Sequence, residues 1–341
     1  MQINKQKLLN VLEEVKPGLA AKEILEQSNT FGFIKGKIAT YNDSVSVQSP
    51  IDLDIEGAVD ANKFYAIINK MKPNKEGCID ISTEDDQIIV SSKKSKAGLA
   101  LQTECKLPLE EINLDGKWKK LPDNFLEGLK VCLPCVSNDF SRPIITCISI
   151  DNEDILAGDG KRLIKYKLNK TIRLKIAIPA QAVSHLIKYN VTHYLVDNEW
   201  GHFKTQNTIF SCRVLNENYP DIHHLFEIQG EEIKFPDKLI DGISRAEVFA
   251  KTDISEDDLV QITIQNGKLL IRGEDGTGWY KEEMKIKSSI EASFYTNPKF
   301  LINILPTLKE CVICEEKGLI KFSSDNWEHV ISIQTAEPTE E

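Results

Sequence analysis

Two pairs of cysteines have the spacing of metal ligands. Cys132 and Cys135 form one C-x-x-C pair, and Cys311 and Cys314 form the other. Four thiolates in two such pairs are the ligand set of a structural zinc site. The pairs are about 175 residues apart, however, whereas a zinc ribbon brings its pairs much closer in sequence. The spacing favours buried free thiols, since reduced cysteine packs like a small hydrophobic residue, and we expect no metal or other cofactor.

Acidic and histidine residues are candidates for catalysis. The carboxylates cluster in stretches such as Glu84-Asp85-Asp86 that read as solvated turns. His223 and His224 are the only adjacent pair among six histidines. The sequence contains no Gly-rich phosphate loop, nucleophile elbow or H-E-x-x-H motif. We therefore predict that the protein is not an enzyme.

The composition is that of a globular protein of two or three domains. The chain has 341 residues, of which 41% are hydrophobic and 28% charged, and its net charge is −10. No run of eighteen apolar residues and no signal peptide occurs, which predicts a cytoplasmic protein without a membrane span. The acidic charge argues against a nucleic-acid-binding protein covered in positive charge. A local basic surface stays possible, because exposed fields decay over a Debye length of about 8–10 Å.

The stretch from Ala157 to Leu163 contains an Asp159-Gly160 turn between two apolar runs. Asp and Gly tolerate the positive φ of a tight turn, so a β-hairpin is the simplest interpretation. Lys161 and Arg162 follow the turn directly. Further along the chain, Asn218-Tyr219-Pro220-Asp221 forms a second distinctive stretch.

Hydrophobic periodicity predicts the same arrangement of elements three times. Each copy has a first helix, a second helix and then a hairpin of short strands. The predicted helices span 5–16 and 62–71 in the first copy, 124–136 and 179–189 in the second, and 236–249 and 297–305 in the third. Asn266-Gly267, between two apolar strands of the third copy, is the strongest hairpin signal.

The copies are too long for a solenoid of small repeats. The predicted core residues Ile68, Ile187 and Ile304 lie 119 and 117 residues apart. This period predicts three tandem α+β domains, each with two helices packed on antiparallel sheets. We place their boundaries in polar, turn-rich stretches, which gives domains at 1–116, 117–229 and 230–341, the last with a short acidic tail at 337–341.

This pattern resembles the bacterial β sliding clamp, the β subunit of DNA polymerase III. The resemblance covers nearly the whole chain and rests on Ala157–Leu163, Tyr219-Pro220-Asp221, Leu107-Pro108 and the opening helix with Leu8, Leu12 and Val15. It implies a homodimeric ring, each chain forming half, that encircles duplex DNA as a processivity factor in replication. It further implies a replicative polymerase and a clamp loader as partners.

The resemblance implies a DNA-facing surface formed by the helices. A ring that tethers without sequence preference needs cations directed at phosphates and no base readout. The candidates are Lys22, Lys70, Lys72, Lys188, Lys238 and Lys299 on the polar sides of the helices, together with Arg142. Each is equally consistent with an ordinary solvated helix face. For the dimer interface, the resemblance indicates the apolar pair Val248-Phe249, opposite the region around Ile112.

The resemblance also implies a pocket that binds a short partner peptide between the second and third domains. Carried over by position, it would contain Ile145, Gly158, Gly160, Lys161, Arg162, Leu163, Pro220, His224, Leu225, Asn297 and Phe300, with the terminal strand residues Val330, Ile331, Ser332 and Ile333. Gly158 stands where the family usually has Thr, Lys161 where it often has His, and Ser332-Ile333-Gln334 replaces its Met-Pro-Met ending. These departures suit a divergent clamp, such as one encoded by a phage or plasmid. Two alternatives are a zinc-dependent nucleic-acid-binding protein and a clamp-fold scaffold without DNA.

Overall fold

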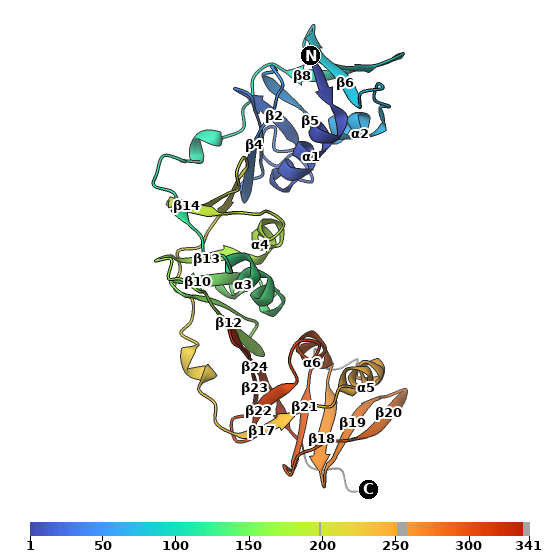
Figure 1. Cartoon of the computed structure of the whole chain (residues 1–341), viewed down its shortest axis with the longest axis vertical. Coiled ribbons are helices and arrows are strands. Elements are labelled where there is room, and N and C mark those ends of the chain that lie inside the picture. The colour runs from blue at the N-terminus through green and yellow to red at the C-terminus, as the bar shows by residue number, and fades with distance from the viewer. Residues whose placement is uncertain (198, 251–257, 337–341) are drawn as a thin grey trace. The chain divides into compact units, whose positions relative to one another are not determined.

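The architecture combines short helices with long antiparallel sheets (Figure 1). It is taken from a computed structural model, which describes residues 1–197, 199–250 and 258–336. The predicted acidic tail at 337–341 lies outside the described residues. The α-helices of the described chain are α1 (Lys5–Val15), α2 (Ala61–Lys70), α3 (Phe125–Cys132), α4 (Ala180–Leu186), α5 (Leu239–Ala246) and α6 (Pro298–Ile304).

The chain folds into two compact units, and each unit is built from two separate stretches of sequence. Unit 1 consists of Met1–Leu129 and Asn169–Glu217, and unit 2 consists of Lys130–Leu168 and Asn218–Glu341. The stretch predicted as the second of three repeats therefore contributes to both units. The division into three domains stays a prediction.

One sheet of twelve strands organises unit 1. Its strands, in spatial order, are β1 (Gln2–Asn4), β6 (Cys78–Glu84), β7 (Gln87–Ser92), β8 (Ser95–Gln102), β5 (Gly57–Asp60), β2 (Thr30–Ile34), β3 (Lys37–Tyr41), β4 (Val45–Pro50), β16 (Ile209–Arg213), β15 (Trp200–Lys204), β14 (His193–Asp197) and β9 (Lys119–Lys120). Strand β13 (Lys175–Pro179) leads into α4. The pairing of β4 with β16 is antiparallel and brings residues 45–48 against residues 209–212.

The helices of unit 1 lie to the same side of this sheet (Figure 1). Asn4 caps helix α1, and its side chain accepts a hydrogen bond from the backbone N–H of Lys7. Asp60 caps α2 in the same way and accepts from the backbone N–H of Lys63. Such caps satisfy backbone donors that a first helical turn leaves unpaired. Leu8 and Leu12 of α1 and Phe64 of α2 are completely buried.

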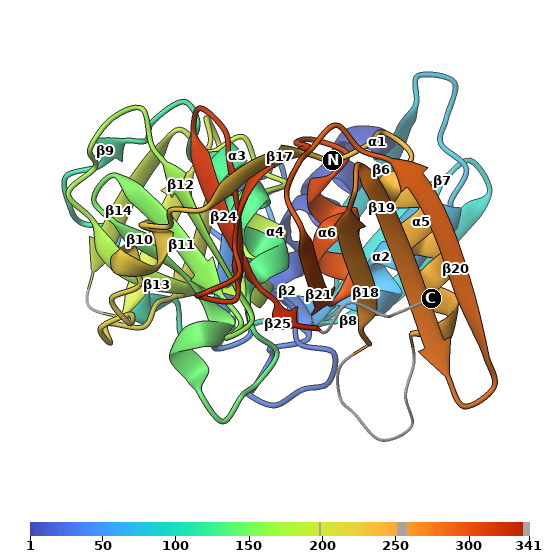
Figure 2. The ribbon, with the colours of Figure 1, turned by 90° about the horizontal axis from the view of Figure 1, so that it is seen from below.

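Two antiparallel sheets form unit 2. Seven strands of the first follow the order β10 (Cys147–Asp151), β11 (Asp154–Gly158), β12 (Arg162–Lys167), β24 (Trp327–Ser332), β23 (Leu319–Ser323), β22 (Glu310–Cys314) and β17 (Glu231–Lys234). The second has the order β20 (Gly278–Lys285), β19 (Lys268–Asp275), β18 (Val260–Gln265), β21 (Ala292–Thr296) and β25 (Gln334–Thr335). Helices α5 and α6 cover one face of the second sheet (Figure 2).

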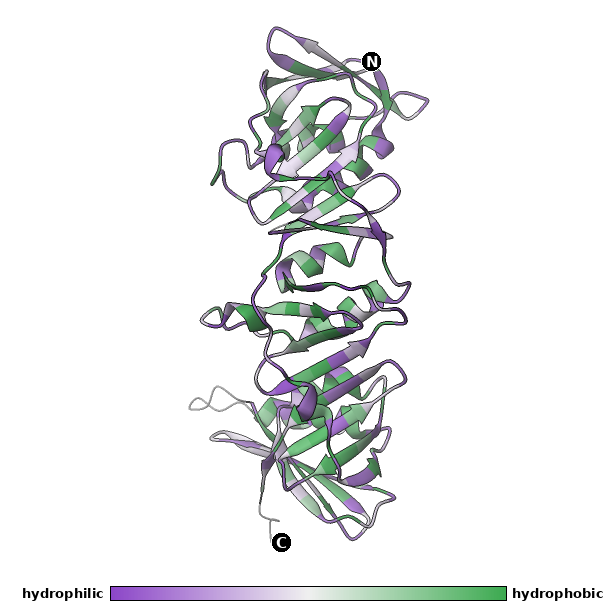
Figure 3. Cartoon of the chain, turned by 90° about the vertical axis from the view of Figure 1, so that its left-hand side faces the viewer, coloured by the Kyte–Doolittle hydropathy of each residue, from purple (hydrophilic) through white to green (hydrophobic). Residues whose placement is uncertain are grey.

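The hydrophobic residues collect on the strands and helices, while the connecting loops are hydrophilic (Figure 3). The predicted alternation of two helices with antiparallel hairpins is confirmed, and Asn266-Gly267 forms the turn between β18 and β19. Two details of the prediction are wrong. Helix α4 ends at Leu186, and the predicted core residue Ile187 lies half-buried at its cap. Helix α5 begins only at Leu239, and its last turn tightens into a 3-10 turn at Glu247–Phe249.

Candidate functional site

The turn at Asp159-Gly160 joins β11 to β12 as the sequence predicts. Gly160 has a φ of +88°, a value that side-chain-bearing residues rarely adopt. The carboxylate oxygen Oδ1 of Asp159 accepts hydrogen bonds from the backbone N–H groups of Lys161 (3.0 Å) and Arg162 (2.9 Å). The side chain of Asp159 thus stabilises the turn, and the direction in which the chain continues into Arg162 is fixed.

The side chain of Arg162 is fixed on several sides. Its Nε lies 2.9 Å from Oδ2 of Asp159, and its Nη2 donates to the backbone carbonyl of Pro134. The guanidinium group stacks over the ring of Phe300, 4.5 Å from the ring centroid. A planar guanidinium suits this combination of bonds and stacking, which a lysine could not reproduce.

An apolar pocket lies beside this arginine, where β12 pairs with β24. Leu163 is opposite Val330 in that pair, and the backbone N–H of Ser332 donates to the carbonyl of Lys161 over 2.8 Å. The cavity measures about 270 Å³. Its walls are Arg142, Ile145, Gly158, Gly160, Lys161, Arg162, Leu163, Tyr219, Pro220, Ile222, Leu225, Leu319, Val330 and Ser332. All of these residues belong to unit 2.

Most of the residues predicted for a peptide pocket line this cavity, and five do not. Those that do are Ile145, Gly158, Gly160, Lys161, Arg162, Leu163, Pro220, Leu225, Val330 and Ser332. Ile331 and Ile333 point into the core, because alternate residues of a strand face opposite sides. Asn297 caps α6, Phe300 lies beneath Arg162, and His224 is exposed on a 3-10 turn at His223–Phe226.

Three pocket residues escaped the prediction: Tyr219, Ile222 and Leu319. Tyr219 belongs to the Asn218–Asp221 stretch, and burial raises the pKa of its hydroxyl well above the usual range. Leu319 reaches the site only because β23 pairs with β24, which sets Leu319 opposite Ser332. No local pattern in the sequence predicts such a pairing between distant strands. Arg142, predicted to face DNA, also lines the pocket.

Comparison with solved structures gives strong matches, although no protein-family model and no curated protein sequence matches the chain. A sliding clamp, the β subunit of DNA polymerase III, from Pseudomonas aeruginosa bound to griselimycin has a TM-score of 0.86 and 14% identity, over 98% of this chain and 99% of that one. The β chain of DNA polymerase III from Streptococcus pneumoniae has a TM-score of 0.86 and 18% identity with the same coverage. The sliding clamp of Bacillus subtilis has a TM-score of 0.81 and 18% identity, over 98% of each chain. This chain has the sliding-clamp fold.

The cations predicted to face DNA are all exposed, but few lie within a helix. Lys70 ends α2 and Lys299 lies in α6, where it forms an ion pair with Asp258 at 3.2 Å. Lys238 is the cap of α5, while Lys72 and Lys188 follow the ends of α2 and α4. Lys22 lies in a bend after the 3-10 turn at Lys16–Gly18 rather than on a helix. In the part of the chain that the structure describes, Lys22, Lys70, Lys72 and Lys188 of unit 1 have no ion-pair partner.

The residues predicted for a dimer interface differ in exposure. Val248 is 65% exposed, and Phe249 is half-buried against Gly278. Ile112 is only 6% exposed, because it packs with Tyr41, Leu107 and Trp200 in a hydrophobic cluster of unit 1. The side chain of Ile112 itself therefore offers little surface to a partner.

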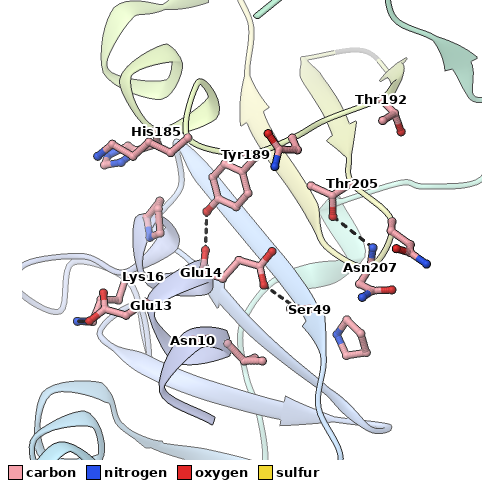
Figure 4. Close-up of a pocket in the computed structure, with 16 residues that line it drawn as sticks. Asn10, Glu13, Glu14, Lys16, Ser49, His185, Tyr189, Thr192, Thr205 and Asn207 are labelled. Carbon is pink, nitrogen blue, oxygen red and sulfur yellow. Dashed lines mark hydrogen bonds and ion pairs between the residues drawn. The ribbon is translucent and has the colours of Figure 1, made fainter. Parts of the chain in front are cut away.

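A larger cavity of about 930 Å³ lies in unit 1, between α1 and the residues that follow α4 (Figure 4). Most of its lining residues are polar: Glu13, Glu14 and Lys16 come from the end of α1 and beyond, and His185 and Lys188 come from α4 and its end. The hydroxyl of Tyr189 donates to the backbone carbonyl of Glu14, which ties the two segments together (Figure 4). Burial lowers the pKa of His185, with a further contribution from Lys188.

The cysteine pairs are not arranged as a ligand set. Cys132 donates to the carbonyl of Ile155, and the sulfur of Cys135 lies 3.5 Å from Nε2 of His329. Burial raises the pKa of the Cys135 thiol to about 12, which disfavours the thiolate that binds metals. Among residues 1–197, 199–250 and 258–336, no three or more His, Cys, Asp or Glu side chains gather in a group that could hold a metal ion. No helix in the same ranges is long and apolar enough to cross a membrane.

Proposed function

We propose that this chain is a DNA sliding clamp, a cytoplasmic processivity factor that encircles duplex DNA and tethers a replicative polymerase. The observation that carries the proposal is the apolar pocket at the β12–β24 pair on a sliding-clamp fold. Its role is tethering rather than catalysis. A clamp loader, which would open and close the ring on DNA, is the second partner in this proposal.

The pocket suits the hydrophobic side chains of a partner peptide. Leu163, Ile222, Leu225, Leu319 and Val330 supply aliphatic walls, and burying a Leu or Phe side chain against them removes apolar surface from water. Interface anchors of this kind contribute most of the binding free energy when they are fully desolvated. Arg162 is already held in place, so that it loses little conformational freedom when a peptide binds.

The exposed cations of unit 1 support a sequence-independent contact with DNA. Lys22, Lys70, Lys72 and Lys188 are free to pair with phosphates, and phosphate contacts carry no sequence information. A tether that must slide needs this kind of contact. The net charge of −10 keeps such binding weak in the absence of a closed ring, because like charges repel the polyanion.

A ring requires more than one chain, and we propose a homodimer of two chains with three clamp domains each. Val248, with 65% of its surface exposed, is the interface residue that the described chain supports best. Changing Val248 to Glu should halve the mass measured by light scattering, while the thermal midpoint of the monomer stays near that of wild type. A variant that keeps the wild-type mass would exclude this residue from the interface.

Retention on circular DNA tests the function directly. The dimer is briefly dissociated in the presence of a plasmid, allowed to close, and separated from free protein by gel filtration. We expect the protein to stay on closed circular plasmid and to leave after a restriction enzyme linearises it. Equal loss from both forms would contradict encirclement, because ordinary electrostatic binding does not depend on DNA ends.

Peptide titration tests the pocket. We expect a fluorescent hexapeptide carrying adjacent Leu and Phe residues to bind, and the Leu163→Ala variant to lose about 2 kcal/mol of affinity, roughly 30-fold. Leu25→Ala is the matched control, since Leu25 is a partly exposed leucine of unit 1. Failure of the wild-type protein to bind would contradict the pocket proposal.

A further inference from the structure

A second cavity of unit 2, with a volume of about 860 Å³, uses the same three strands as the apolar pocket. The pocket contains one residue from each of β12, β24 and β23, namely Leu163, Val330 and Leu319. Two positions along the same strands, the second cavity contains Lys165, Glu328 and Lys321. Residues two apart on a strand share a face and lie about 7 Å from each other. The apolar pocket and this charged cavity are therefore neighbours on one face of the sheet.

The 3-10 turn at His223–Phe226 separates the two cavities. Ile222 and Leu225 line the apolar pocket, whereas His223 and Phe226 line the charged cavity. The backbone N–H of Leu225 donates to the carbonyl of Ile222 over 3.1 Å, and 3-10 bonds of this kind have poorer geometry than those of an α-helix. The position of the Ile222 and Leu225 wall thus depends on what holds the turn against the sheet.

Lysines of the charged cavity bind the end of this turn. Nζ of Lys321 donates to the carbonyl of Phe226 over 2.7 Å, and Nζ of Lys317 donates to the carbonyl of Glu227 over 3.2 Å. Nζ of Lys165 lies 4.7 Å from the centroid of the Phe226 ring, which is buried. Phe226 is therefore held through both its backbone and its ring.

Glu328 fixes two of these lysines. One of its carboxylate oxygens lies 2.6 Å from Nζ of Lys165, and the other pairs with Nζ of Lys321. Burial alone would raise the pKa of Glu328, but hydrogen bonds from Lys165 and Lys321 lower it, so the carboxylate is ionised at neutral pH. The side chain of Lys321 is only 16% exposed. Withdrawing such charges from water costs free energy that their attraction often fails to offset, so folding stability alone does not explain the cluster.

We propose that Lys321 is a positioning residue of the peptide pocket. Its ammonium group, fixed by Glu328, binds the carbonyl of Phe226. The turn is thereby kept where Ile222 and Leu225 form a preformed wall, which lowers the entropy lost when a peptide binds. The inference rests on the proposed peptide docking.

Lys321→Met tests this role in the full-length protein, because methionine keeps much of the aliphatic stem and removes the ammonium group. We expect the Leu-Phe hexapeptide of the pocket test to bind about three- to tenfold more weakly, since part of its binding free energy must then order the turn. Amide hydrogen exchange at Leu225 should accelerate by a similar factor, whereas exchange in β12 and β24 keeps the wild-type rate. Fluorescence titration and hydrogen exchange measure the two effects.

Lys268→Met is the matched control. Lys268 is also a strand lysine of unit 2 and lies 3.2 Å from its partner Glu283, but it belongs to the second sheet, so its replacement should leave hexapeptide binding unchanged. A double-mutant comparison separates positioning from general stability. In a Leu225→Ala background the wall is already truncated, and Lys321→Met should cost much less affinity there than in wild type.

Unchanged hexapeptide affinity in Lys321→Met would overturn the proposal and show that the packing of Phe226 alone holds the turn. Equal losses of affinity in the wild-type and Leu225→Ala backgrounds would overturn it as well, because Lys321 would then act independently of the wall. If the wild-type protein does not bind the hexapeptide at all, the docking function fails first. Hydrogen exchange at Leu225 then decides by itself whether Lys321 positions the turn.

Discussion

In unit 1, strand β4 pairs with β16, and in unit 2, β12 pairs with β24. The strands that flank these two pairs also correspond, residue by residue, in their register. In unit 1, Tyr41 of β3 lies opposite Ser46 of β4. At the matching position of unit 2, Gly158 of β11 lies opposite Leu163 of β12. Ser46 then faces Ser211, as Leu163 faces Val330. One strand further, Trp200 faces Arg213, as Leu319 faces Ser332. The two junctions share a backbone pattern and differ in side chains.

The junction in unit 1 is filled by large side chains. The rings of Tyr41 and Trp200 lie 5.9 Å apart, and the guanidinium of Arg213 lies 4.9 Å from the centroid of Trp200. Arg213 is in turn paired with Asp43 (2.9 Å) and Glu199 (2.8 Å). We call Tyr41, Trp200 and Arg213 the aromatic plug.

The corresponding positions of unit 2 are Gly158, Leu319 and Ser332, and a pocket stands there. A Cβ atom on Gly158 would lie 2.4 Å from Cδ2 of Leu163 and 3.1 Å from the backbone oxygen of Arg162, so a larger residue there would have to displace the Leu163 side chain. The comparison teaches that side-chain volume, and not the path of the backbone, decides which junction can receive a ligand. It also suggests substitutions that would fill the pocket of unit 2 and substitutions that would destabilise the junction of unit 1.

The largest expected effect comes from transplanting part of the plug into unit 2. The double change Leu319→Trp and Ser332→Arg should fill the pocket and reduce hexapeptide affinity by at least about 3 kcal/mol, more than 100-fold. Fluorescence titration measures it. Retention on circular DNA serves as the control for a folded ring, and undiminished peptide binding would place the peptide elsewhere.

Removing the plug should destabilise unit 1. Trp200 is 4% exposed, so Trp200→Leu leaves a cavity and should cost about 3 kcal/mol of unfolding free energy. Leu319→Ala at the matching position of unit 2 should cost about 1 kcal/mol, since Leu319 already borders a cavity. Urea denaturation of both variants gives the comparison, and equal losses would show that the plug is not better packed than the pocket wall.

Each unit also carries a buried histidine on the strands of its junction. Burial lowers the pKa of His202 in β15 to about 4, and burial with the nearby Arg162 charge lowers that of His329 in β24 to about 3. Both histidines are neutral when folded, whereas the unfolded chain binds their protons below a pH of about 6.5. Stability contributed by the neutral form is thus present above that pH and is lost as the pH falls toward the folded pKa.

Each histidine should lower the free energy of unfolding at pH 5 by about 2 kcal/mol relative to its value at neutral pH. His202→Gln and His329→Gln should each flatten the slope of unfolding free energy against pH between 6.5 and 5 by about one proton. Denaturation at several pH values reads this slope separately from any loss at neutral pH. An unchanged slope in either variant would mean that the histidine is protonated in the folded protein.

The smallest effect concerns the ion pairs over the plug. Glu199 is 71% exposed where it meets Arg213, and exposed ion pairs contribute well under about 1 kcal/mol. Glu199→Gln should therefore destabilise unit 1 slightly at low salt, and the difference should vanish as added salt shortens the Debye length to about 3 Å near 1 M. A large, salt-independent loss would mean that Glu199 helps to pack Trp200.

Local sequence patterns predicted much of the fold and part of the pocket. Asn4 and Asn297 cap helices α1 and α6, and the Asp159-Gly160 turn holds β11 against β12. These features depend on residues a few positions apart, whose spacing is written in the chain. The clamp resemblance extended this to ten residues that the structure finds around one pocket. The predicted ends of α4 and α5 were less accurate, because helix ends depend on packing as well as propensity.

The tertiary structure alone decided where the pocket is open. Residues 142–163 and 319–332 meet through the β12–β24 and β23–β24 pairings, and residues 219–225 pack against them. Contacts between such distant segments leave no local pattern in a sequence. It likewise buried Ile112 beside Trp200, turned Ile331 and Ile333 into the core, and left Phe140 in water. The physical reason is the two-residue period of a strand: the partner and the register determine which face each side chain occupies.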